Sequence, residues 1–328
     1  MSTSFRLRPR GPFALGEAVA FLGAWSPGRT SGAQSIDHLH LAFVVDRTDR
    51  TVGVCLRQDG AELVGEVFGS DDAAPVERQV ARTLSVDLDA TPFAAIGERD
   101  PVVGRLLDNR PGFRPVNFLS TFEAACWFIL SQRLRMSQAA TLKQRITDEH
   151  GASISIHGDR RSAFPAPARL RSVRELTSLP ERKLANLRSL ADAALAGALD
   201  ADHLRAIPSE QAIGELEALP GIGPFSAEGI LLRGAGAPDV LSLREPRLRR
   251  AVGQAYGFST DPSDAELTAI ADGWRPFRTW VGVLFRSTSG ASESRLSSAP
   301  AKGQNEIVSQ TSTARAISSS VGTSARRK

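Results

Sequence analysis

The chain contains few of the residues that build covalent or metal-based frameworks. Its 328 residues include two cysteines, Cys55 and Cys126. Two thiols cannot form a disulfide framework, a four-cysteine zinc site or an iron–sulfur cluster held by four cysteines. His38 and His40 lie two apart on a predicted strand and could face one metal ion, but no third ligand is near them in the sequence. We interpret them as surface or cross-strand imidazoles.

Long apolar segments are missing as well. No apolar run reaches the length of a membrane-spanning helix, and Met1–Pro12 lacks the apolar centre of a signal peptide. We therefore expect a soluble, intracellular protein without a membrane partner.

Most of the chain has no excess of charge of either sign. Lys and Arg number 40 and Asp and Glu number 36, so the formal net charge is +4. Residues 287–328 account for all of this excess, and residues 1–286 carry no net charge. A surface for nucleic acid on the body of the protein must therefore be a local cluster of basic side chains. The charged residues after position 286 are Glu293, Arg295, Lys302, Glu306, Arg315, Arg326, Arg327 and Lys328.

The first part of the chain has the pattern of a small sheet. Residues 36–45, 51–57 and 62–68 alternate apolar and polar side chains and are separated by Asp, Gly and Arg, which is typical of antiparallel strands joined by turns. A short helix or an extended lead-in is expected over 13–25 and a helix over 76–84. The sequence predicts a small α+β domain over residues 1–110.

From about residue 92 the strand pattern almost disappears and helix signals replace it. Ser120 and Glu123 have the spacing of a capping box, as do Ser263 and Glu266. The predicted helices cover 120–132, 139–150, 181–196, 209–218, a segment from 224, 246–257, 263–272 and 276–285, with an irregular connection over 152–169. The predicted fold class is α+β, in which an all-α domain over residues 111–286 follows the small antiparallel-sheet domain.

The last segment differs in composition from the rest. Residues 287–328 are rich in Ser, Thr and Ala, have no hydrophobic period and contain almost no large apolar residues. Such a segment buries too little surface to offset the entropy of ordering, so we predict a disordered tail.

One short segment between two predicted helices carries the clearest functional signal, Leu219-Pro-Gly-Ile-Gly-Pro-Phe-Ser-Ala227. Pro224 suits a first helical position, because its missing N–H would be unpaired there. Gly221 and Gly223 let the turn adopt backbone angles closed to other residues. The amides of Gly221, Gly223 and Ser226 are then bare at a helix N-terminus, where an anion can bind. The segment predicts a helix–hairpin–helix that binds a DNA phosphate. The alternative is an ordinary turn between two helices.

The order of these parts resembles bacterial DNA-3-methyladenine glycosylase II, the AlkA-like family of the helix–hairpin–helix DNA glycosylase superfamily. The resemblance covers most of residues 13–286 and leaves out only the tail. It rests on short motifs that occur in the family's order. Besides the hairpin they are Leu88-Asp-Ala-Thr-Pro-Phe93, Pro111-Gly-Phe-Arg-Pro115, Thr121-Phe-Glu-Ala124, Ile129-Leu-Ser-Gln132, Phe164-Pro-Ala-Pro167, Arg233-Gly234, Pro238-Asp-Val240 and Trp274-Arg-Pro-Phe-Arg-Thr-Trp280.

This resemblance implies a DNA N-glycosylase of base-excision repair in the bacterial cytoplasm, associated with the nucleoid and acting as a monomer. Family members flip a damaged, alkylated base out of double-stranded DNA and hydrolyse the bond between base and sugar. A carboxylate beside the sugar stabilises the charge that develops there and helps a water to attack. Two alternatives stay open: a catalytically impaired protein that binds DNA or lesions without excision, and a general binder of DNA structures.

The family's catalytic Asp corresponds to Glu245 in this sequence. Pro246 follows as a first helical residue, so we expect Glu245 at the helix N-cap, where the helix dipole favours an ionised carboxylate. The extra methylene moves the carboxylate by about a bond length, and a displacement of ~1 Å can cost about a hundredfold in rate. The neighbouring Arg244 is expected to compete for the carboxylate. The alternative role for Glu245 is that of a charge at a helix N-terminus.

The resemblance also assigns the base pocket. Its candidate residues are Phe122, Trp127 and Phe225, with Gly229 where the family often has an aromatic residue and Arg286 where the best-known members have a Trp. We expect these last two changes to make the pocket wider and less aromatic. A cationic Arg286 is a poor neighbour for a cationic alkylpurine, which makes a neutral or deaminated base a second candidate substrate. Bifunctional relatives carry a Schiff-base Lys at the position of Phe225, so we expect hydrolysis without lyase activity.

Two further elements complete the DNA contacts that the resemblance implies. Gln132 and Arg133 correspond to the wedge that fills the gap left by the flipped base. A cluster of arginines beside Glu245 predicts marked salt dependence of binding. Its members are Arg244, Arg247, Arg249 and Arg250.

The family also holds a monovalent cation at the hairpin. Main-chain carbonyls bridge this ion to the DNA phosphate, and the matching positions here are Glu217, Leu219 and Ile222. We therefore expect Na+ or K+ at this turn and no other cofactor.

Overall fold

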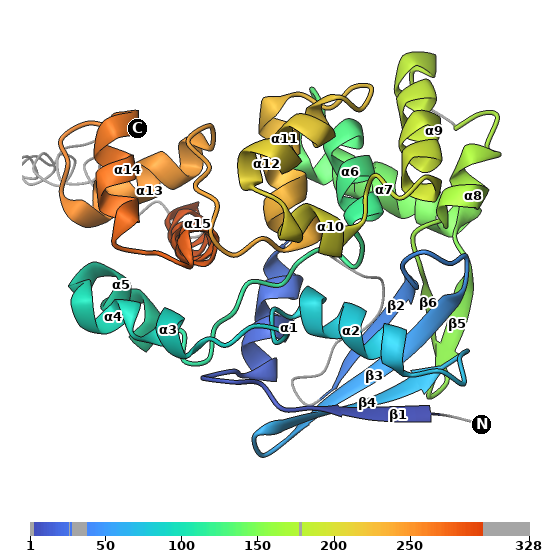
Figure 1. Cartoon of the computed structure of the whole chain (residues 1–328), viewed down its shortest axis with the longest axis horizontal. Helices are drawn as coiled ribbons and strands as arrows, with labels where there is room; N and C mark the ends of the chain where they lie inside the picture. Colours follow the sequence, from blue (N-terminus) through green and yellow to red (C-terminus); the bar gives the residue numbers. More distant parts are fainter. Residues whose placement is uncertain (1–2, 26, 28–37, 177–178, 298–328) are drawn as a thin grey trace, which may run out of the picture. The chain divides into compact units, whose positions relative to one another are not determined.

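The computed structural model describes residues 3–25, 27, 38–176 and 179–297 (Figure 1). Met1–Ser289 forms one compact unit, and Gly290–Lys328 is a separate one. Within the described residues the fold is α+β, with two small antiparallel sheets and many helices, which confirms the predicted fold class.

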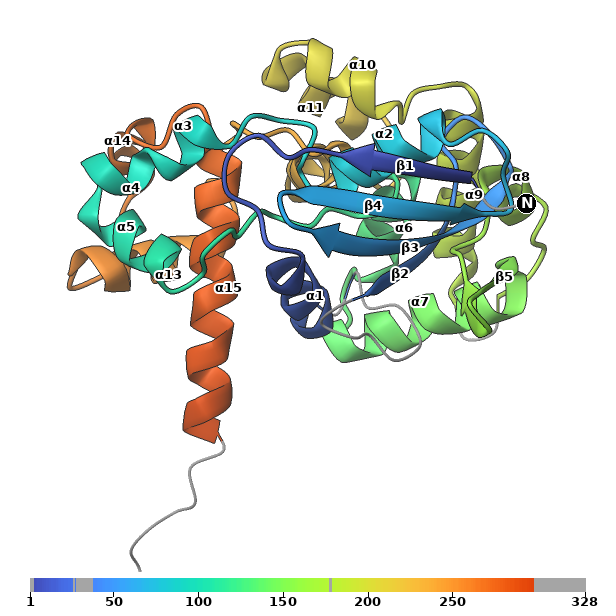
Figure 2. The same ribbon diagram turned by 90° about the horizontal axis from the view of Figure 1, so that it is seen from below.

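The larger sheet has four antiparallel strands in the order β1-β4-β3-β2 (Figure 2). The predicted strands are present as β2, β3 and β4, whereas β1 has no clear signal in the sequence. Phe5 of β1 lies opposite Gly65, and a Cβ atom on Gly65 would lie 2.2 Å from the Phe5 ring. The glycine thus makes room for a ring from a distant segment, a relationship that local periodicity does not reveal. The strands are β1 (Thr3–Leu7), β2 (Leu39–Val44), β3 (Thr51–Asp59) and β4 (Glu62–Phe68).

A second, two-stranded sheet corrects the expectation of an irregular connection over 152–169. Strands β5 (Ser153–Ile156) and β6 (Asp159–Ser162) form a hairpin, and it lies beside the larger sheet in Figure 1. Ile154 and Ile156 pack against the backbone of Gly53, where an added Cβ would meet both side chains within 3.1 Å. Strands of four residues are too short to show a period, and their partner is a glycine about a hundred residues earlier in the sequence.

The helices follow the predicted order. Ser120 caps α6 by accepting from the Glu123 amide at 3.0 Å, and Ser263 and Glu266 form the full capping box of α14. Early helices are α1 (Leu15–Ala24), α2 (Ala74–Thr83), α3 (Thr91–Ala94), α4 (Ile96–Arg99) and α5 (Pro101–Asp108). Central ones are α6 (Thr121–Leu130), α7 (Met136–His150), α8 (Pro167–Arg171), α9 (Glu181–Leu195), α10 (Ala201–Ala206), α11 (Ser209–Glu217), α12 (Pro224–Ile230) and the π-helix η2 (Leu231–Ala235). The last are α13 (Pro246–Tyr256), α14 (Asp264–Asp272) and α15 (Arg278–Ser297).

Helix α15 corrects the predicted start of the disordered tail. It continues to Ser297, beyond the expected end at residue 286. Extending a helix that is already nucleated adds one hydrogen bond for each residue fixed, so a polar sequence can prolong a helix that begins in a core. The rest of the predicted tail, residues 298–328, lies outside the described residues.

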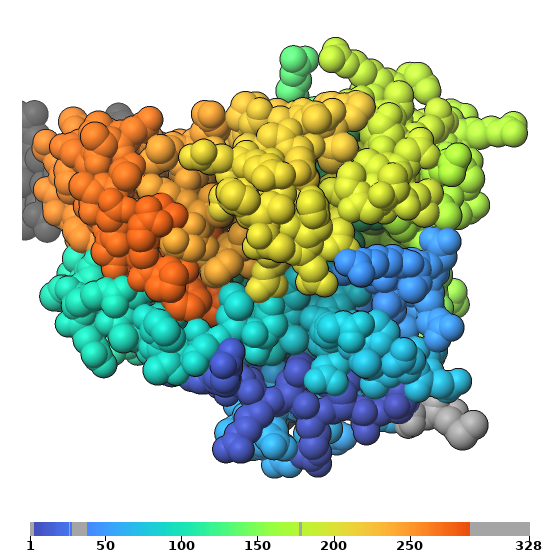
Figure 3. Space-filling model, in the orientation of Figure 1, coloured from blue at the N-terminus to red at the C-terminus, as the bar shows by residue number. Residues whose placement is uncertain are grey.

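Two hydrophobic cores position the functional residues. One joins the sheet and α1–α5 to α13–α15, and the other lies among α6, α9–α12 and η2. In the first core the ring of Phe93 meets those of Phe277 and Trp280 at centroid distances of 5.7 and 5.2 Å. The space-filling view shows α3–α5 directly against the C-terminal helices (Figure 3). Packing thus crosses the predicted boundary at residue 110, and the division into domains stays a prediction.

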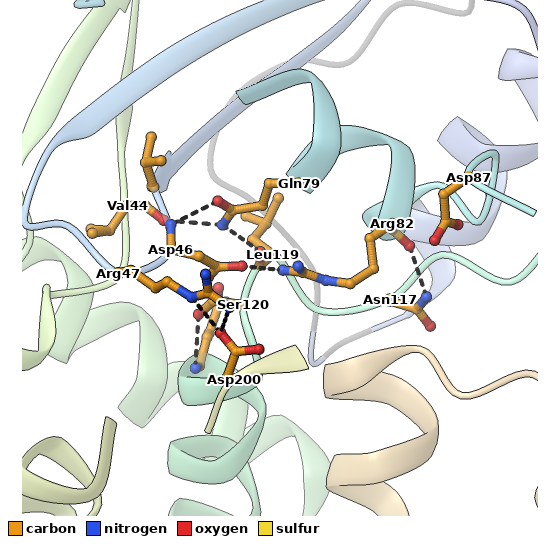
Figure 4. Close-up of polar contacts among 12 residues, drawn as sticks. Val44, Asp46, Arg47, Gln79, Arg82, Asp87, Asn117, Leu119, Ser120 and Asp200 are labelled. Atoms are coloured by element: carbon orange, nitrogen blue, oxygen red, sulfur yellow. Dashed lines mark hydrogen bonds and ion pairs between the residues drawn. The ribbon is translucent and has the colours of Figure 1, made fainter. Parts of the chain in front are cut away.

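A polar seam joins the sheet to the helices (Figure 4). Gln79 of α2 donates to the carbonyls of Val44 and Leu119, at 3.0 and 2.8 Å, and accepts from the Asp46 amide at 2.8 Å. Arg82 forms an ion pair with Asp46 at 2.5 Å. Because one side chain satisfies groups on β2 and before α6, the seam fixes the sheet against the start of α6.

Arg114 forms a second fixed point, in the first core. It is 2% exposed, and its guanidinium donates to the carbonyls of Pro12, Ser85 and Leu88 at 2.9 to 3.1 Å. It also donates to the carbonyls of Arg10 and Gly11. One side chain therefore satisfies five main-chain acceptors of two segments.

We expect Arg114→Met to lower the free energy of unfolding by about 3 kcal/mol or more, because it leaves several buried carbonyls without donors. Urea denaturation followed by circular dichroism measures the change. Arg78→Met, at an exposed position of α2, is the control and is expected to change stability by less than about 0.5 kcal/mol. Equal stability of the two variants would contradict the assigned role of Arg114.

Candidate active site and DNA-binding surface

The predicted hairpin is formed by α11 and α12. Gly221 has φ +82°, and an added Cβ would lie 2.2 Å from Asn186 Nδ2, so both angle and space require glycine. Gly223 has φ −105°, which other residues can adopt. The prediction that its backbone angles require glycine is therefore wrong. A Cβ there would meet nothing within 4 Å. Because Gly223 has no side chain, the N-terminus of α12 is open at this point. A phosphate would need this space to reach the amides.

The amides at the start of α12 are available for an anion. The first amide that closes a helical turn is that of Ala227, which donates to the Gly223 carbonyl at 2.9 Å. The amides before it have no acceptor within the helix. The amides of Gly221 and Gly223 and that of Ser226, which is 8% exposed, come from this single turn.

The predicted wedge is attached to the hairpin. Gln132 donates from Nε2 to the Gly221 carbonyl at 2.8 Å, and Lys183 Nζ donates to the Gln132 carbonyl at the same distance. Arg133 is exposed and has φ +60°, a conformation that costs a non-glycine residue about 1 kcal/mol or more. Burial, with a smaller effect of the Arg133 charge, lowers the pKa of Lys183. Two elements almost ninety residues apart in sequence thus form one surface.

The candidate cation site lies on the other side of the same turn. Glu217 ends α11, and the last carbonyls of a helix lack intrahelical donors. The Leu219 carbonyl accepts from the Ile222 amide at 3.1 Å and keeps a second lone pair. Neutral oxygen donors of this kind suit a hard cation such as Na+ or K+, so the residues present fit the ion. Among the described residues, no group of three or more His, Cys, Asp or Glu side chains could hold a metal ion.

Beside the hairpin lies a cavity of about 340 Å³. Of the predicted site residues, it brings together Trp127, Phe225, Gly229, Glu245, Arg247 and Arg286. Sequence reasoning missed several others that line it, among them Trp25, Phe118, Phe128 and Arg233.

Glu245 is the N-cap of α13, as predicted. It is 5% exposed, and its Oε1 accepts from the Arg247 amide at 3.1 Å and faces Arg247 Nε at 3.3 Å. Its Oε2 lies 3.3 Å from a guanidinium nitrogen of Arg286 on α15. Burial lowers the pKa of Arg286, and the Glu245 carboxylate opposes that effect. The carboxylate is therefore held at the cavity wall by a helix N-terminus and two guanidinium groups.

Arg244 does not pair with Glu245, which corrects the expectation from sequence. Its Nε lies 3.1 Å from Glu228 Oε1 on α12, and Ser242 donates its hydroxyl to Glu228 Oε2 at 2.8 Å. The reason is geometric, because Arg244 precedes the helix and points toward α12, whereas Arg247 lies in the first turn above the carboxylate. Arg249 forms an ion pair with Asp264. Of the predicted cluster, Arg247 is the member that lines the cavity.

Gly229 was expected to make the pocket wider and less aromatic, but an aromatic ring fills the space beside it. Phe128 lies over Gly229, where an added Cβ would be 2.0 Å from the ring. Phe225 is 45% exposed and meets the Phe128 ring edge-to-face at 6.1 Å. An aromatic side chain from α6 therefore occupies the space that Gly229 leaves on α12. Five aromatic residues line the cavity: Trp25, Phe118, Trp127, Phe128 and Phe225.

Phe122 is not part of this cavity. It belongs to the second core, packs against Phe164 at a centroid distance of 6.2 Å and borders a different cavity beside the β2–β3 turn. On α6 it lies five residues before Trp127, which places the two side chains on different faces of the helix.

Arg233 enters the cavity wall from η2. The residue is 7% exposed, and its guanidinium carbon lies 4.2 Å from the centroid of the Trp25 ring. It donates to the Val116 carbonyl, while its Nε has no partner. Burial, with a smaller effect of Arg286, lowers the pKa of Arg233 to about 9. A lone Arg in the apolar run Ile230–Ala235 is the sequence signal that could have identified it.

The fold defined by this hairpin and its neighbouring cavity is that of the helix–hairpin–helix DNA glycosylases. A solved structure of 3-methyladenine DNA-glycosylase from Archaeoglobus fulgidus has a TM-score of 0.70 and 21% identity, covering 86% of this chain and 96% of that one. The 8-oxoguanine glycosylase/lyase of Clostridium acetobutylicum, solved in complex with double-stranded DNA, has a TM-score of 0.63 and 16% identity, covering 86% and 93%. At these identities the likeness shows the fold.

The sequence has relatives of the same class. DNA-3-methyladenine glycosylase of Bacillus subtilis is 24% identical, covering 64% of this chain and 74% of that protein. DNA-3-methyladenine glycosylase 2 of Escherichia coli is 30% identical, covering 57% of this chain and 64% of that protein. No family model matches the chain. The chain is thus similar in sequence to DNA-3-methyladenine glycosylases and similar in fold to the helix–hairpin–helix DNA glycosylases.

Because Gly229 contacts the Phe128 ring, we expect substitutions at these two positions to have non-additive effects on stability. Gly229→Ala is expected to lower stability by about 1–3 kcal/mol, because the new methyl overlaps the ring. In a Phe128→Ala background the same substitution is expected to be almost neutral. Urea denaturation of the two single variants and the double variant measures the coupling. Additive effects would contradict the placement of the Phe128 ring.

Proposed function

We propose that this protein is a DNA N-glycosylase of base-excision repair that hydrolyses the bond between a damaged base and its sugar. The observation that carries the proposal is the buried Glu245 carboxylate at the wall of an aromatic cavity next to the α11–α12 hairpin. The names of the relatives indicate alkylated bases as a substrate class. Damaged double-stranded DNA is the partner.

Each of these elements would contact a different part of the DNA. The amides of Gly221, Gly223 and Ser226 would hold a phosphate, and the carbonyls of Glu217 and the hairpin turn would hold a monovalent cation beside it. Arg133, which is exposed and has a left-handed backbone conformation, would enter the duplex as the wedge. Arg247 is 60% exposed at its side chain and would contribute to backbone contacts.

The chemistry would take place at Glu245. A flipped base stacks between the aromatic walls, which places its sugar at the mouth of the cavity. The ionised carboxylate stabilises the positive charge that develops on the sugar as the bond to the base breaks. It then accepts a proton from the water that attacks the sugar. The Arg247 amide at the N-terminus of α13 donates to the carboxylate and fixes its position.

A lyase step has no support in the cavity. The described residues that line it include no lysine. The two lysines among the described residues, Lys143 and Lys183, are both outside the lining. Lys143 pairs with Glu123, and Lys183 donates to the carbonyls of Leu130 and Gln132. A Schiff base with the sugar needs a primary amine at C1′, so we propose hydrolysis alone.

Glu245→Gln tests the assignment of the carboxylate. We expect single-turnover release of an alkylated base from duplex DNA to fall by about a hundredfold or more, because the neutral amide cannot stabilise the charge on the sugar. DNA affinity should stay within about twofold. Glu98→Gln, on the exposed surface of α4, is the matched control and should retain full activity.

Glu245→Asp tests the effect of side-chain length. A shorter acid would bring the carboxylate toward the family's position, and we expect it to raise the rate of release. Turnover unchanged by Glu245→Gln would refute the catalytic role. Binding of lesion DNA without release of any base by the unsubstituted protein would instead support the non-catalytic alternative.

Borohydride trapping tests the absence of a lyase. With DNA that contains an abasic site, sodium borohydride should yield no covalent protein–DNA complex, since no amine reaches C1′. A bifunctional 8-oxoguanine glycosylase/lyase serves as the positive control. Trapping at a level comparable to that control would contradict the proposal and would make Lys183 the first residue to substitute.

A further inference from the structure

We propose that Arg233 and Arg286 read the flipped base, and that they favour an uncharged base with a carbonyl oxygen over an N-alkylated purine with a positive charge. This inference rests on the proposed function and specifies the substrate class of the same cavity.

Arg233 has donor capacity that the protein does not use. It lines the cavity and is 7% exposed, and its buried Nε–H has no acceptor among the described residues. Its guanidinium is held by stacking at 4.2 Å from the Trp25 centroid and 5.3 Å from that of Phe21. A cationic side chain that lines a partly buried cavity favours a ligand that supplies a hydrogen-bond acceptor.

The π-helix accounts for the position of this side chain. Residues Leu231–Ala235 form η2, and its carbonyl at Arg233 accepts from the Phe118 amide at 2.8 Å. A π-turn inserted in a helix rotates the following side chains and commonly occurs at functional sites. The bulge therefore fixes Arg233 to the segment before α6, with its guanidinium against Trp25.

The cavity as a whole is cationic. Among the described residues that line it, Glu245 is the one acid, whereas the lining contains four arginines. Arg278 is neutralised by Asp239, with Nε to Oδ1 at 2.8 Å. Of the other three, Arg247 and Arg286 pair with the Glu245 carboxylate, and Arg233 adds a further positive charge. A base with its own positive charge would meet repulsion in this partly buried space, where charges are poorly screened.

The same groups would assist departure of a neutral base. As the C1′–N bond breaks, its electron pair stays on the base, and the negative charge spreads to the carbonyl oxygen. Guanidinium N–H groups donate to that oxygen, as Arg does to guanine O6 and N7. The water oxygen forms the new bond to C1′, its proton passes to Glu245, and the released base takes a proton from solvent. A cationic base leaves as a neutral molecule, so no net negative charge develops on it for these donors to stabilise.

The test compares matched lesions in one duplex sequence. Single-turnover release is measured for 8-oxoguanine and hypoxanthine, which are uncharged, and for 7-methylguanine and 3-methyladenine, which are cationic. Each rate is divided by the spontaneous rate for that lesion. We expect greater acceleration for the uncharged pair. Arg233→Gln and Arg286→Gln should each shift the ratio by about tenfold toward the cationic pair. Arg78→Gln should leave both rates unchanged.

The outcomes separate this inference from the proposed function. Greater acceleration for the cationic pair, or a ratio that neither variant changes, would overturn the inference while leaving the glycosylase activity in place. Equal loss of both rates in a variant shows a structural role and counts against it. If no lesion is released, the proposed function fails. The inference is then tested by binding: tighter binding of duplexes with uncharged lesions, lost in the Arg233 and Arg286 variants, supports it, and equal binding of both kinds of duplex overturns it.

Discussion

The ion pair between Glu245 and Arg286 connects the parts of this protein on which its chemistry depends. It joins the N-terminus of α13 to α15 across the wall of the cavity. A carboxylate that is 5% exposed needs such partners, because burial of an unpaired charge is very costly. The helix amide at Arg247 and the Arg286 guanidinium supply them. The buried carboxylate therefore has hydrogen-bond and ion-pair partners at the wall of an aromatic cavity.

The same ion pair gives one explanation for two departures from the family pattern. Glu245 replaces an Asp, and Arg286 replaces a Trp of the best-known members. Considered separately, each change predicts a weaker enzyme. In the structure the longer acid reaches the arginine, so the two changes complement each other in length and charge. The pair places an acid and a guanidinium donor together at the wall of the cavity.

The hairpin and the helices near it could be predicted from sequence because their signals are local. Proline at a first helical turn, glycine at φ +82° at position 221 and the Ser263 capping box all act within a few residues. The N-cap position of Glu245 followed for the same reason. The β5–β6 hairpin was missed because its partners are distant glycines of the large sheet.

The cavity wall was harder to predict, because it is assembled from segments that lie far apart in the chain. Phe128 and Gly229 come from different helices, and neither position alone shows that the ring fills the space above the glycine. The direction of Arg244 toward Glu228 depends on the distance between α12 and the start of α13. Arg233 had a local signal as a single charge in an apolar run, but its partner Trp25 lies in the N-terminal part.

The most direct test of the site is a crystal structure of the protein with duplex DNA that contains a 2′-fluoro analogue of a lesion, which resists cleavage. The flipped base should lie in the cavity beside Trp127 and Phe128, with the Glu245 carboxylate within about 4 Å of C1′ and the hairpin amides at a phosphate. A base that stays stacked in the duplex, or a Glu245 carboxylate that still faces only Arg247 and Arg286 away from the sugar, would contradict the assignment of Glu245 as the catalytic group.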